Sequence, residues 1–188
     1  MNISDPFTNA PSPENREDKE NRVYGFLEKI GTGIYGLSHD SADTMEICEK
    51  IEEKLGAEIC KNLFLCNAQA TSFYLLMMPG KKVFKTKFLS KQINSSRLSF
   101  GSAENLEKYL DITPGSVSVM GLLNDSEKAV KLLIDKDLLS LSHIGVHPCI
   151  NTSTIKISTD DLINKIIPAM GREYVVVDLP DPEKLSAE

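Results

Sequence analysis

A short polar segment in the last third of the chain holds residue types suited to binding a small polar ligand. It runs from Gly145 to Thr154, reads GVHPCINTST and lies between two strand-like runs. Pro148 fixes its own φ angle and favours an extended conformation at His147. The four residues after Ile150 supply side-chain donors and acceptors at consecutive positions. The segment predicts a rigid loop that either grips a ligand or forms a plain turn whose side chains cap backbone groups.

Basic residues are concentrated in the middle of the chain, although the protein as a whole has a net charge of −6. The stretch 61–101 contains no Asp or Glu. A local patch of this kind can hold phosphates even when the net charge is negative. The alternative is an ordinary solvated lysine-rich face. The basic residues of this stretch are Lys61, Lys81, Lys82, Lys85, Lys87, Lys91 and Arg97.

The cysteines predict neither a metal site nor a disulfide framework. Cys48, Cys60, Cys66 and Cys149 form no CxxC pair and no Cys/His spacing typical of zinc. Cys149 follows His147 by two residues, but the intervening proline disrupts the strand geometry that a Cys–His nucleophile would need. The N-terminus lacks the features of a signal peptide and no apolar run is long enough to span a bilayer. We therefore expect a cytoplasmic protein with reduced thiols and no membrane association.

The length of 188 residues predicts one domain with a substantial core. Residues 1–11 and 181–188 read as tails, which leaves 12–180 as the folded part. Helical and strand-like segments are interspersed with hairpins, which favours an α/β domain with a mixed sheet and flanking helices.

Periodicity and capping signals place the individual elements. Ser12 and Pro13 predict the start of a first helix, and Asp43 to Glu46 resembles a capping box for a second. The predicted helices are 13–30, 45–55, 87–93, 103–110, 136–141 and 159–167. The predicted strands and extended segments are 34–38, 57–66, 72–78, 97–100, 117–123, 130–135, 141–146, 154–157 and 174–179.

Several of these segments, in this order and spacing, resemble one known family. They are KNLFL from Lys61, FYLL from Phe73, RLSF from Arg97, TPGSVS from Thr113 and HPCINTST from His147. Together they are similar to the YbaK and prolyl-tRNA synthetase-associated editing domain family. Within it, the similarity is greatest to the free-standing alanyl-tRNA(Pro) deacylases. The resemblance covers about residues 20–179.

The resemblance implies a curved mixed sheet with a pocket at its open side, and hydrolysis of the ester that joins a wrong amino acid to tRNA(Pro). It implies no metal and no organic cofactor. Lys61 and His147 would be the catalytic residues, with His147 acting as a wall and orienting group or as a general base. Lys61 would meet a phosphate or the developing oxyanion, and Asn62 the amine or the ribose. The remaining implied substrate-binding residues are Gly145, Val146, Pro148, Asn151 and Thr152.

Alanine is smaller than proline, so a synthetase pocket built for proline cannot exclude it sterically. A second site that admits alanine and rejects proline corrects this error. The implied partners are the acceptor end of mischarged tRNA(Pro), held by the basic stretch 81–97, and prolyl-tRNA synthetase. Two alternatives remain: removal of another small amino acid such as cysteine, or a non-catalytic domain that binds aminoacyl-tRNA or a synthetase.

Overall fold

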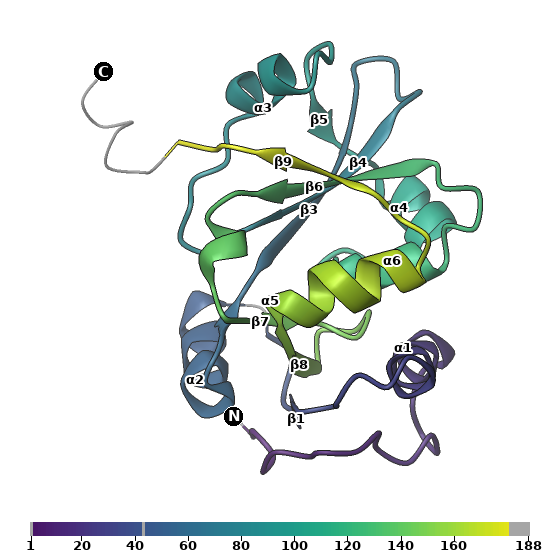
Figure 1. The fold of residues 1–188 in the computed structure, drawn as a ribbon, viewed down its shortest axis with the longest axis vertical. Helices are drawn as coiled ribbons and strands as arrows, with labels where there is room; N and C mark the ends of the chain where they lie inside the picture. The colour runs from purple at the N-terminus through teal and green to yellow at the C-terminus, as the bar shows by residue number, and fades with distance from the viewer. Residues whose placement is uncertain (1, 43, 181–188) are drawn as a thin grey trace.

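The computed structural model describes residues 2–42 and 44–180 and forms an α/β domain with two mixed sheets (Figure 1). The predicted mixed α/β architecture is confirmed, but the strands divide between two sheets. The four-stranded sheet has the order β1 (Gly36–Ser38), β8 (Ser153–Ser158), β7 (His143–Val146) and β2 (Glu58–Ile59). The five-stranded sheet has the order β5 (Ser99–Phe100), β3 (Lys61–Cys66), β4 (Phe73–Met78), β6 (Val130–Asp135) and β9 (Tyr174–Val177).

The two sheets are joined where β2 runs into β3. Ile59 pairs with Gly145 in the four-stranded sheet, and Lys61 pairs with Met78 in the five-stranded sheet. Cys60 lies between them, and its backbone N–H donates to the Gly145 carbonyl oxygen at 3.0 Å. A single buried residue therefore carries the chain from one sheet to the other, which is why the predicted strand 57–66 appears as two strands.

The predicted β-hairpin over residues 57–78 is confirmed for residues 61–78. β3 and β4 pair antiparallel along their whole length, and every residue of β4 is buried. Both faces are covered because β4 has the central core on one side and a second apolar cluster on the other. Such a strand needs a continuous apolar sequence, as FYLLMM provides.

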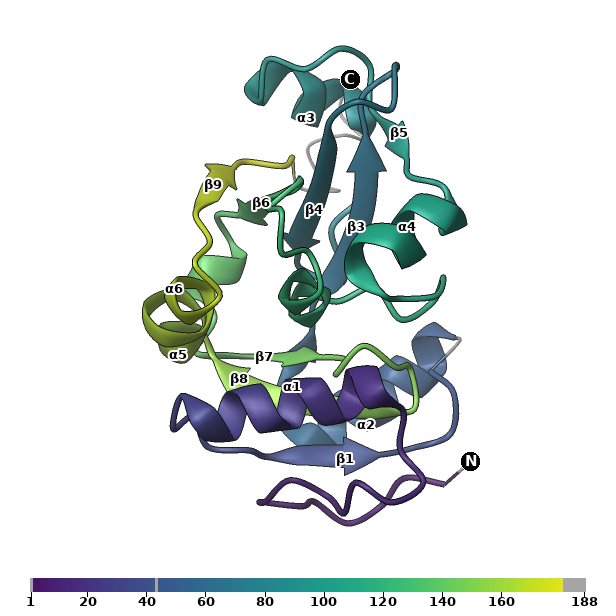
Figure 2. The same ribbon diagram turned by 90° about the vertical axis from the view of Figure 1, so that its right-hand side faces the viewer.

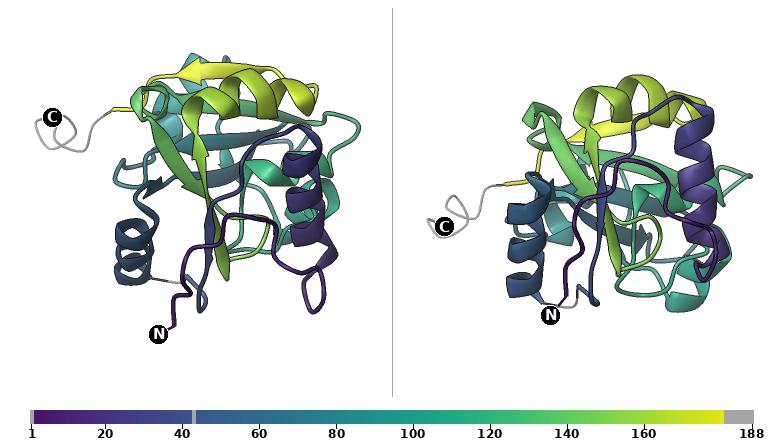
Figure 3. Two further views of the ribbon diagram at one scale, coloured as in Figure 1. Left: turned by 60° about the horizontal axis from the view of Figure 1, so that its bottom comes forward. Right: turned by 90° about the horizontal axis from the view of Figure 1, so that it is seen from below.

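The helices cover the outer faces of the sheets and the ends of the core. α1 (Asp18–Lys29) and α2 (Met45–Leu55) flank the four-stranded sheet on opposite sides (Figure 3). Val23 and Leu27 of α1 enter the central core, whereas Ile51 and Leu55 of α2 form a separate cluster with Leu37. The other helices are α3 (Thr86–Gln92) and α4 (Ala103–Leu110), with 3₁₀ turns at Val119–Leu123 and Leu138–Ser140. A last continuous helical run consists of α5 (Thr159–Asp161), a π turn (Leu162–Ile166) and α6 (Ile167–Ala169).

Capping explains where two helices begin. The hydroxyl of Thr44 accepts from the backbone N–H of Ile47 at the start of α2, and the Ser102 hydroxyl accepts from Asn105 at the start of α4. Three other predictions were wrong, the first being the helix 136–141, where the chain forms only the 3₁₀ turn Leu138–Ser140. α1 begins at Asp18 rather than at Pro13, and the segment 117–123, predicted as extended, contains a 3₁₀ turn because Ser118 caps it.

The N-terminal segment, predicted to be a frayed tail, packs against β1 (Figure 2). Ile3 and Phe7 form isolated bridges with His39 and Gly36. The side chain of Ile3 packs on the α2 cluster and that of Phe7 on the central core. These contacts cover the edge of β1 and so protect it from pairing with another strand. The predicted tail 181–188 and Asp43 of the predicted capping box lie outside the described residues.

Candidate active site

The loop between β7 and β8 is rigid and holds His147 in one orientation. His147 Nδ1 lies 2.9 Å from the Ser153 carbonyl oxygen and 3.3 Å from the Thr154 hydroxyl oxygen. At the tip of the loop, Cys149 adopts a φ of 66° although it is only 3% exposed. A left-handed conformation at a buried non-glycine residue persists only where the surrounding packing determines it.

A second histidine, His39, extends this hydrogen-bond network and fixes the tautomers of both rings. His39 Nδ1 lies 2.8 Å from the Asp40 carbonyl oxygen, and His39 Nε2 lies 2.8 Å from the Thr154 hydroxyl oxygen. Because a carbonyl only accepts, His39 Nδ1 carries the ring proton and Nε2 accepts from Thr154. The Ser153 carbonyl places the proton of His147 on Nδ1 by the same reasoning. His147 Nε2 is then a lone-pair acceptor, and nothing in the described ranges hydrogen-bonds to it.

Both rings are held in the neutral form. Burial lowers the pKa of His147; the Ser153 carbonyl opposes this shift and His39 adds to it. Burial also lowers the pKa of His39, against the hydrogen bond to the Asp40 carbonyl. The ring centroids are 6.2 Å apart, so a charge on one ring disfavours a charge on the other. A neutral imidazole with a free Nε2 can orient a water molecule or accept a proton.

Lys61 and Asn62 begin β3 and contact opposite faces of it. Lys61 Nζ lies 3.4 Å from the Lys82 carbonyl oxygen, on the face that carries the groove beside Phe84. Asn62 Nδ2 lies 3.3 Å from both the carbonyl oxygen and the Sγ of Cys60, on the face of the central core. Side chains alternate along a strand, so a ligand that touches both residues must lie at the β2–β3 junction rather than on one face of the sheet.

Asn62 also carries an acceptor that the fold leaves unused. Its Oδ1 atom is buried and, within residues 2–42 and 44–180, has no hydrogen-bond partner. The contact of Nδ2 with the Cys60 carbonyl fixes which amide atom is the acceptor. A buried acceptor without a donor costs about 1–3 kcal/mol. That cost is recovered if a ligand donates a hydrogen bond here.

The pairing of β2 with β7 brings the Lys61 strand and the His147 loop together. Ile59 pairs with Gly145 in parallel register. Lys61 and His147 each lie two residues beyond this pair, in the same direction. Within residues 2–42 and 44–180, no hydrogen bond or ion pair joins Lys61 to His147. That the two residues line one substrate site stays a prediction.

Two of the implied substrate-binding residues serve packing. A Cβ on Gly145 would lie 3.1 Å from side-chain atoms of both Ile59 and Leu55, so glycine permits the close approach of α2 and β2 to β7. Val146 is fully buried in the central core. Gly145 has no side chain and the Val146 side chain is buried, so either residue could meet a ligand only through its backbone, and their role in substrate binding stays a prediction. Pro148 is also buried and shapes the loop through its backbone.

Asn151 and Thr152 connect the loop to the segment after β1. Asn151 Nδ2 donates to the Ser41 hydroxyl at 2.7 Å, and the Asn151 carbonyl accepts from the Ala42 N–H at 3.0 Å. The Thr152 carbonyl accepts from the His39 N–H at 2.9 Å, while its side chain is exposed. Asn151 therefore fixes the loop, whereas the Thr152 side chain is exposed to solvent.

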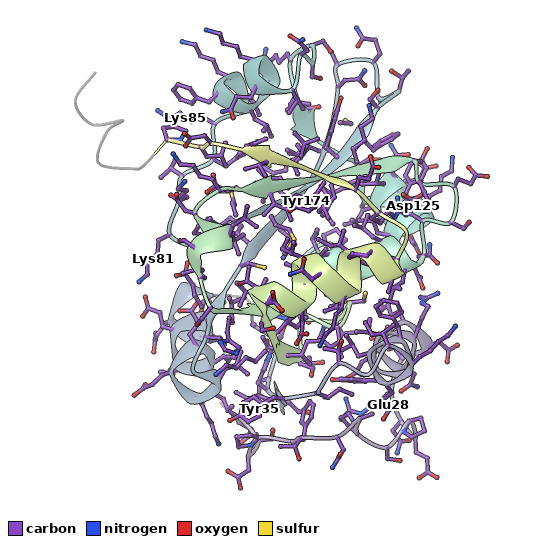
Figure 4. The ribbon with its side chains drawn as sticks, in the orientation of Figure 1. Glu28, Tyr35, Lys81, Lys85, Asp125 and Tyr174 are labelled. Atoms are coloured by element: carbon purple, nitrogen blue, oxygen red, sulfur yellow. The ribbon has the colours of Figure 1, made fainter. Side chains whose placement is uncertain are left out.

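Most of the predicted phosphate-binding residues are exposed, with one exception. Figure 4 shows Lys81 and Lys85 along the same side of the molecule. Lys82 is only 5% exposed and donates to Asp135 at 2.8 Å and to the Leu179 carbonyl at 2.9 Å. Lys82 cannot bind phosphate, and that prediction is corrected. The exposed members of the predicted set are Lys81, Lys85, Lys87, Lys91 and Arg97.

Cys149, two residues from His147, is poorly suited to act as a nucleophile. Burial raises the pKa of the Cys149 thiol to about 12, so it is not a thiolate near neutral pH. In the part of the chain that the structure describes, no group of three or more His, Cys, Asp or Glu side chains is arranged to hold a metal ion. No helix there is both long enough and apolar enough to cross a bilayer.

Comparison with known proteins identifies the family. The model of the aminoacyl-tRNA editing domain matches residues 39–165, which include both histidines and the start of β3. The chain belongs to the aminoacyl-tRNA editing domain family. It is 35% identical over 162 residues to the "Prolyl-tRNA editing protein ProX" of Acetoanaerobium sticklandii, covering 86% of this chain and 98% of that protein. It is 24% identical over 148 residues to "Prolyl-tRNA synthetase associated domain-containing protein 1" of Danio rerio, covering 78% and 80%.

Solved structures share the fold of this editing-domain chain at lower identity. One, described as a candidate trans-editing enzyme for prolyl tRNA synthetase, has a TM-score of 0.68 at 18% identity, and the match covers 89% of this chain and 99% of that chain. Another, a scaffold from a study of computational epitope grafting, has a TM-score of 0.68 at 17% identity and covers 88% and 99%. These likenesses support the arrangement of two sheets across the whole domain.

Proposed function

We propose that this protein is a trans-acting aminoacyl-tRNA deacylase that hydrolyses the ester between alanine and tRNA(Pro). The observation that carries the proposal is the 35% identity to ProX over 98% of that protein's length. Because the match spans the whole relative, the activity that its name states can belong to this domain alone. The substrate of such an enzyme is produced by prolyl-tRNA synthetase, which makes the synthetase the candidate partner and the cytoplasm the expected location.

The site residues can divide the chemistry of ester hydrolysis between them. Water attacks the carbonyl carbon, the bond to the ribose oxygen breaks, and the proton of the water ends on the ribose hydroxyl. His147 Nε2, as a neutral acceptor, orients the attacking water. The Lys61 cation stabilises either the oxyanion or the terminal phosphate. The buried Asn62 Oδ1 accepts a hydrogen bond from the substrate ammonium group.

Specificity in this proposal comes from size and from the rigidity of the loop. Alanine differs from proline by a few methylene groups, each worth only about 1–3 kcal/mol in an apolar pocket. A rigid pocket wall increases the discrimination between the two amino acids, because it cannot move aside to admit the larger proline. The left-handed Cys149 and the bonds from Asn151 give the loop that rigidity.

The proposal is tested by incubating the purified protein with tRNA(Pro) charged separately with alanine, cysteine, serine or proline. We expect rapid release of alanine and no release of proline above the spontaneous rate. Faster release of cysteine than of alanine would change the amino acid but keep the reaction. If no amino acid is released, the domain is a non-catalytic binder of aminoacyl-tRNA.

The neutral state of His147 predicts the pH dependence of that activity. Burial lowers its pKa, so the active neutral form exists above the ordinary histidine value of about 6.5 and is lost only at lower pH. We expect a deacylation rate, corrected for spontaneous hydrolysis, that is flat from about pH 6.5 upwards and falls as His147 becomes protonated. The exposed His143 provides a control, since His143→Ala should keep the same profile. An inflection above pH 7 would show that another group controls the rate.

A further inference from the structure

A groove beside the start of β3 combines aromatic and basic side chains. It has a volume of about 490 Å³ and lies between β3, β5 and the beginning of α3. α3 and β5 lie together at the end of the five-stranded sheet toward which β3 runs (Figures 1 and 2). Its lining residues are Lys61, Leu63, Phe84, Lys85, Thr86, Lys87 and Phe100.

The aromatic part of the groove is unusually exposed. Phe100 is 63% exposed, and it belongs to the two-residue edge strand β5, where it pairs with Leu65. Phe84 is half-buried, and its ring centroid lies 6.0 Å from that of Phe100 at an angle of 64°. Phe84 thus supports Phe100 edge-on and leaves much of the Phe100 side chain open to solvent. An exposed aromatic ring next to a groove indicates a contact with a ligand.

The charged part of the groove has one sign. Lys61, Lys85 and Lys87 contribute cations, and no acidic residue lines the groove. The stretch 61–101 that supplies every lining residue contains no Asp or Glu, although the protein carries a net charge of −6. Positive charge is therefore concentrated in the groove of a protein whose net charge is negative, so the ligand that the groove attracts is an anion.

A flat apolar face next to several cations matches one kind of ligand in particular. An unpaired nucleotide has a base with a π-face and a phosphate with a negative charge. In single-stranded binding sites, bases stack on aromatic side chains while basic residues follow the backbone. A base within a double helix is already stacked on its neighbours, so only an unpaired nucleotide can use Phe100 in this way.

We propose that this groove binds an unpaired nucleotide of the single-stranded 3′ end of tRNA, with its base on Phe100 and its phosphates against Lys85 and Lys87. The inference rests on the proposed function, because it assigns a subsite to the same substrate. Lys61 belongs both to this groove and to the β2–β3 junction. A strand that occupies the groove is therefore led toward the end of the strand pair where His147 lies.

The test measures binding of an uncharged RNA hairpin that copies the tRNA(Pro) acceptor stem, with and without its unpaired 3′ nucleotides. We expect the wild-type protein to prefer the tailed hairpin. Phe100→Ala and Phe100→Leu should weaken binding of the tailed hairpin by roughly 5- to 100-fold and leave that of the blunt one unchanged. Phe100→Trp should retain the preference because it keeps a π-face. Val176→Ala removes part of a half-exposed valine on β9 and is the matched control.

The outcomes separate this inference from the proposed deacylase activity. If the wild-type protein binds both hairpins equally, or if Phe100→Leu keeps the full preference for the tailed hairpin, the inference is overturned. If the wild-type protein deacylates tRNA(Pro) but the Phe100 variants bind the tailed hairpin as tightly as the wild-type protein does, the inference is contradicted and the proposed function is not. A preference for the tailed hairpin that depends on Phe100, without release of any amino acid, would support the inference and contradict the proposed function.

Discussion

Lys82→Met is expected to lower the free energy of unfolding by about 3–5 kcal/mol, because it leaves the buried Asp135 carboxylate without its cation. Lys82 Nζ donates to Asp135 at 2.8 Å, to Asp137 at 2.6 Å and to the Leu179 carbonyl at 2.9 Å. Burial alone would lower the pKa of Lys82, but the hydrogen bonds to the two carboxylates outweigh burial and raise it. The lysine is therefore charged, and it ties the segment after β4 to the ends of β6 and β9.

Urea denaturation measures this effect, with the slope against denaturant used to check that both proteins unfold in the same way. Lys85→Met is the matched control, since Lys85 is exposed and nearby in sequence. Lys82→Met combined with Asp135→Asn should recover part of the loss, because the uncompensated charge is removed. A loss below about 1 kcal/mol for Lys82→Met would mean that the pair is solvated and contributes little.

Lys61→Met is expected to reduce kcat/KM for alanyl-tRNA(Pro) by about 100-fold or more, with little change in stability. Removal of one group that stabilises the developing negative charge typically costs about 10²- to 10³-fold. Within the described residues, the only hydrogen bond of the Lys61 side chain in the free protein is a long one to the Lys82 carbonyl at 3.4 Å. Little folding energy depends on this contact, so activity and stability can be separated.

Steady-state deacylation kinetics and thermal unfolding, measured on the same preparations, test this prediction. Lys131→Met is the control, because Lys131 is an exposed lysine of β6 that is outside the predicted phosphate-binding set and does not line the groove. A Lys61→Met enzyme with at least half of the wild-type kcat/KM would remove Lys61 from the mechanism. A variant that loses activity only in parallel with its stability would give Lys61 a structural role.

The sequence predicts those parts of the fold that depend on neighbouring residues. Ser102 and Thr44 cap their helices because the capping contact spans three residues. The β3–β4 hairpin follows from two apolar runs separated by a short turn. By contrast, the division into two sheets depends on the pairing of Ile59 with Gly145, and nothing local marks Cys60 as the place where one strand becomes two. The N-terminal segment likewise packs through a few scattered apolar side chains, among them Ile3, Phe7 and Ala10, which form no periodic pattern.

The residues of the candidate site likewise divide into those that the local sequence predicts and those that only tertiary contacts bring into place. His147 stands out because of the proline and polar residues beside it, but its partners cannot be read from its surroundings in the sequence. His39 is 115 residues from Thr154 and reaches it only in the folded protein. Lys82 looks like its exposed neighbour Lys81, because the partner that buries it, Asp135, is 53 residues away. Net charge and local pattern therefore predict a basic region, and tertiary contacts decide which of its lysines are available.

The central claim is that this domain by itself removes alanine from tRNA(Pro) and spares proline. The most direct test is the single-turnover release of each amino acid from tRNA(Pro) by the wild-type protein, compared with release in buffer. We expect alanine to be released much faster than in buffer and proline to be released at the buffer rate. Equal acceleration of both, or no acceleration of alanine, would contradict the account.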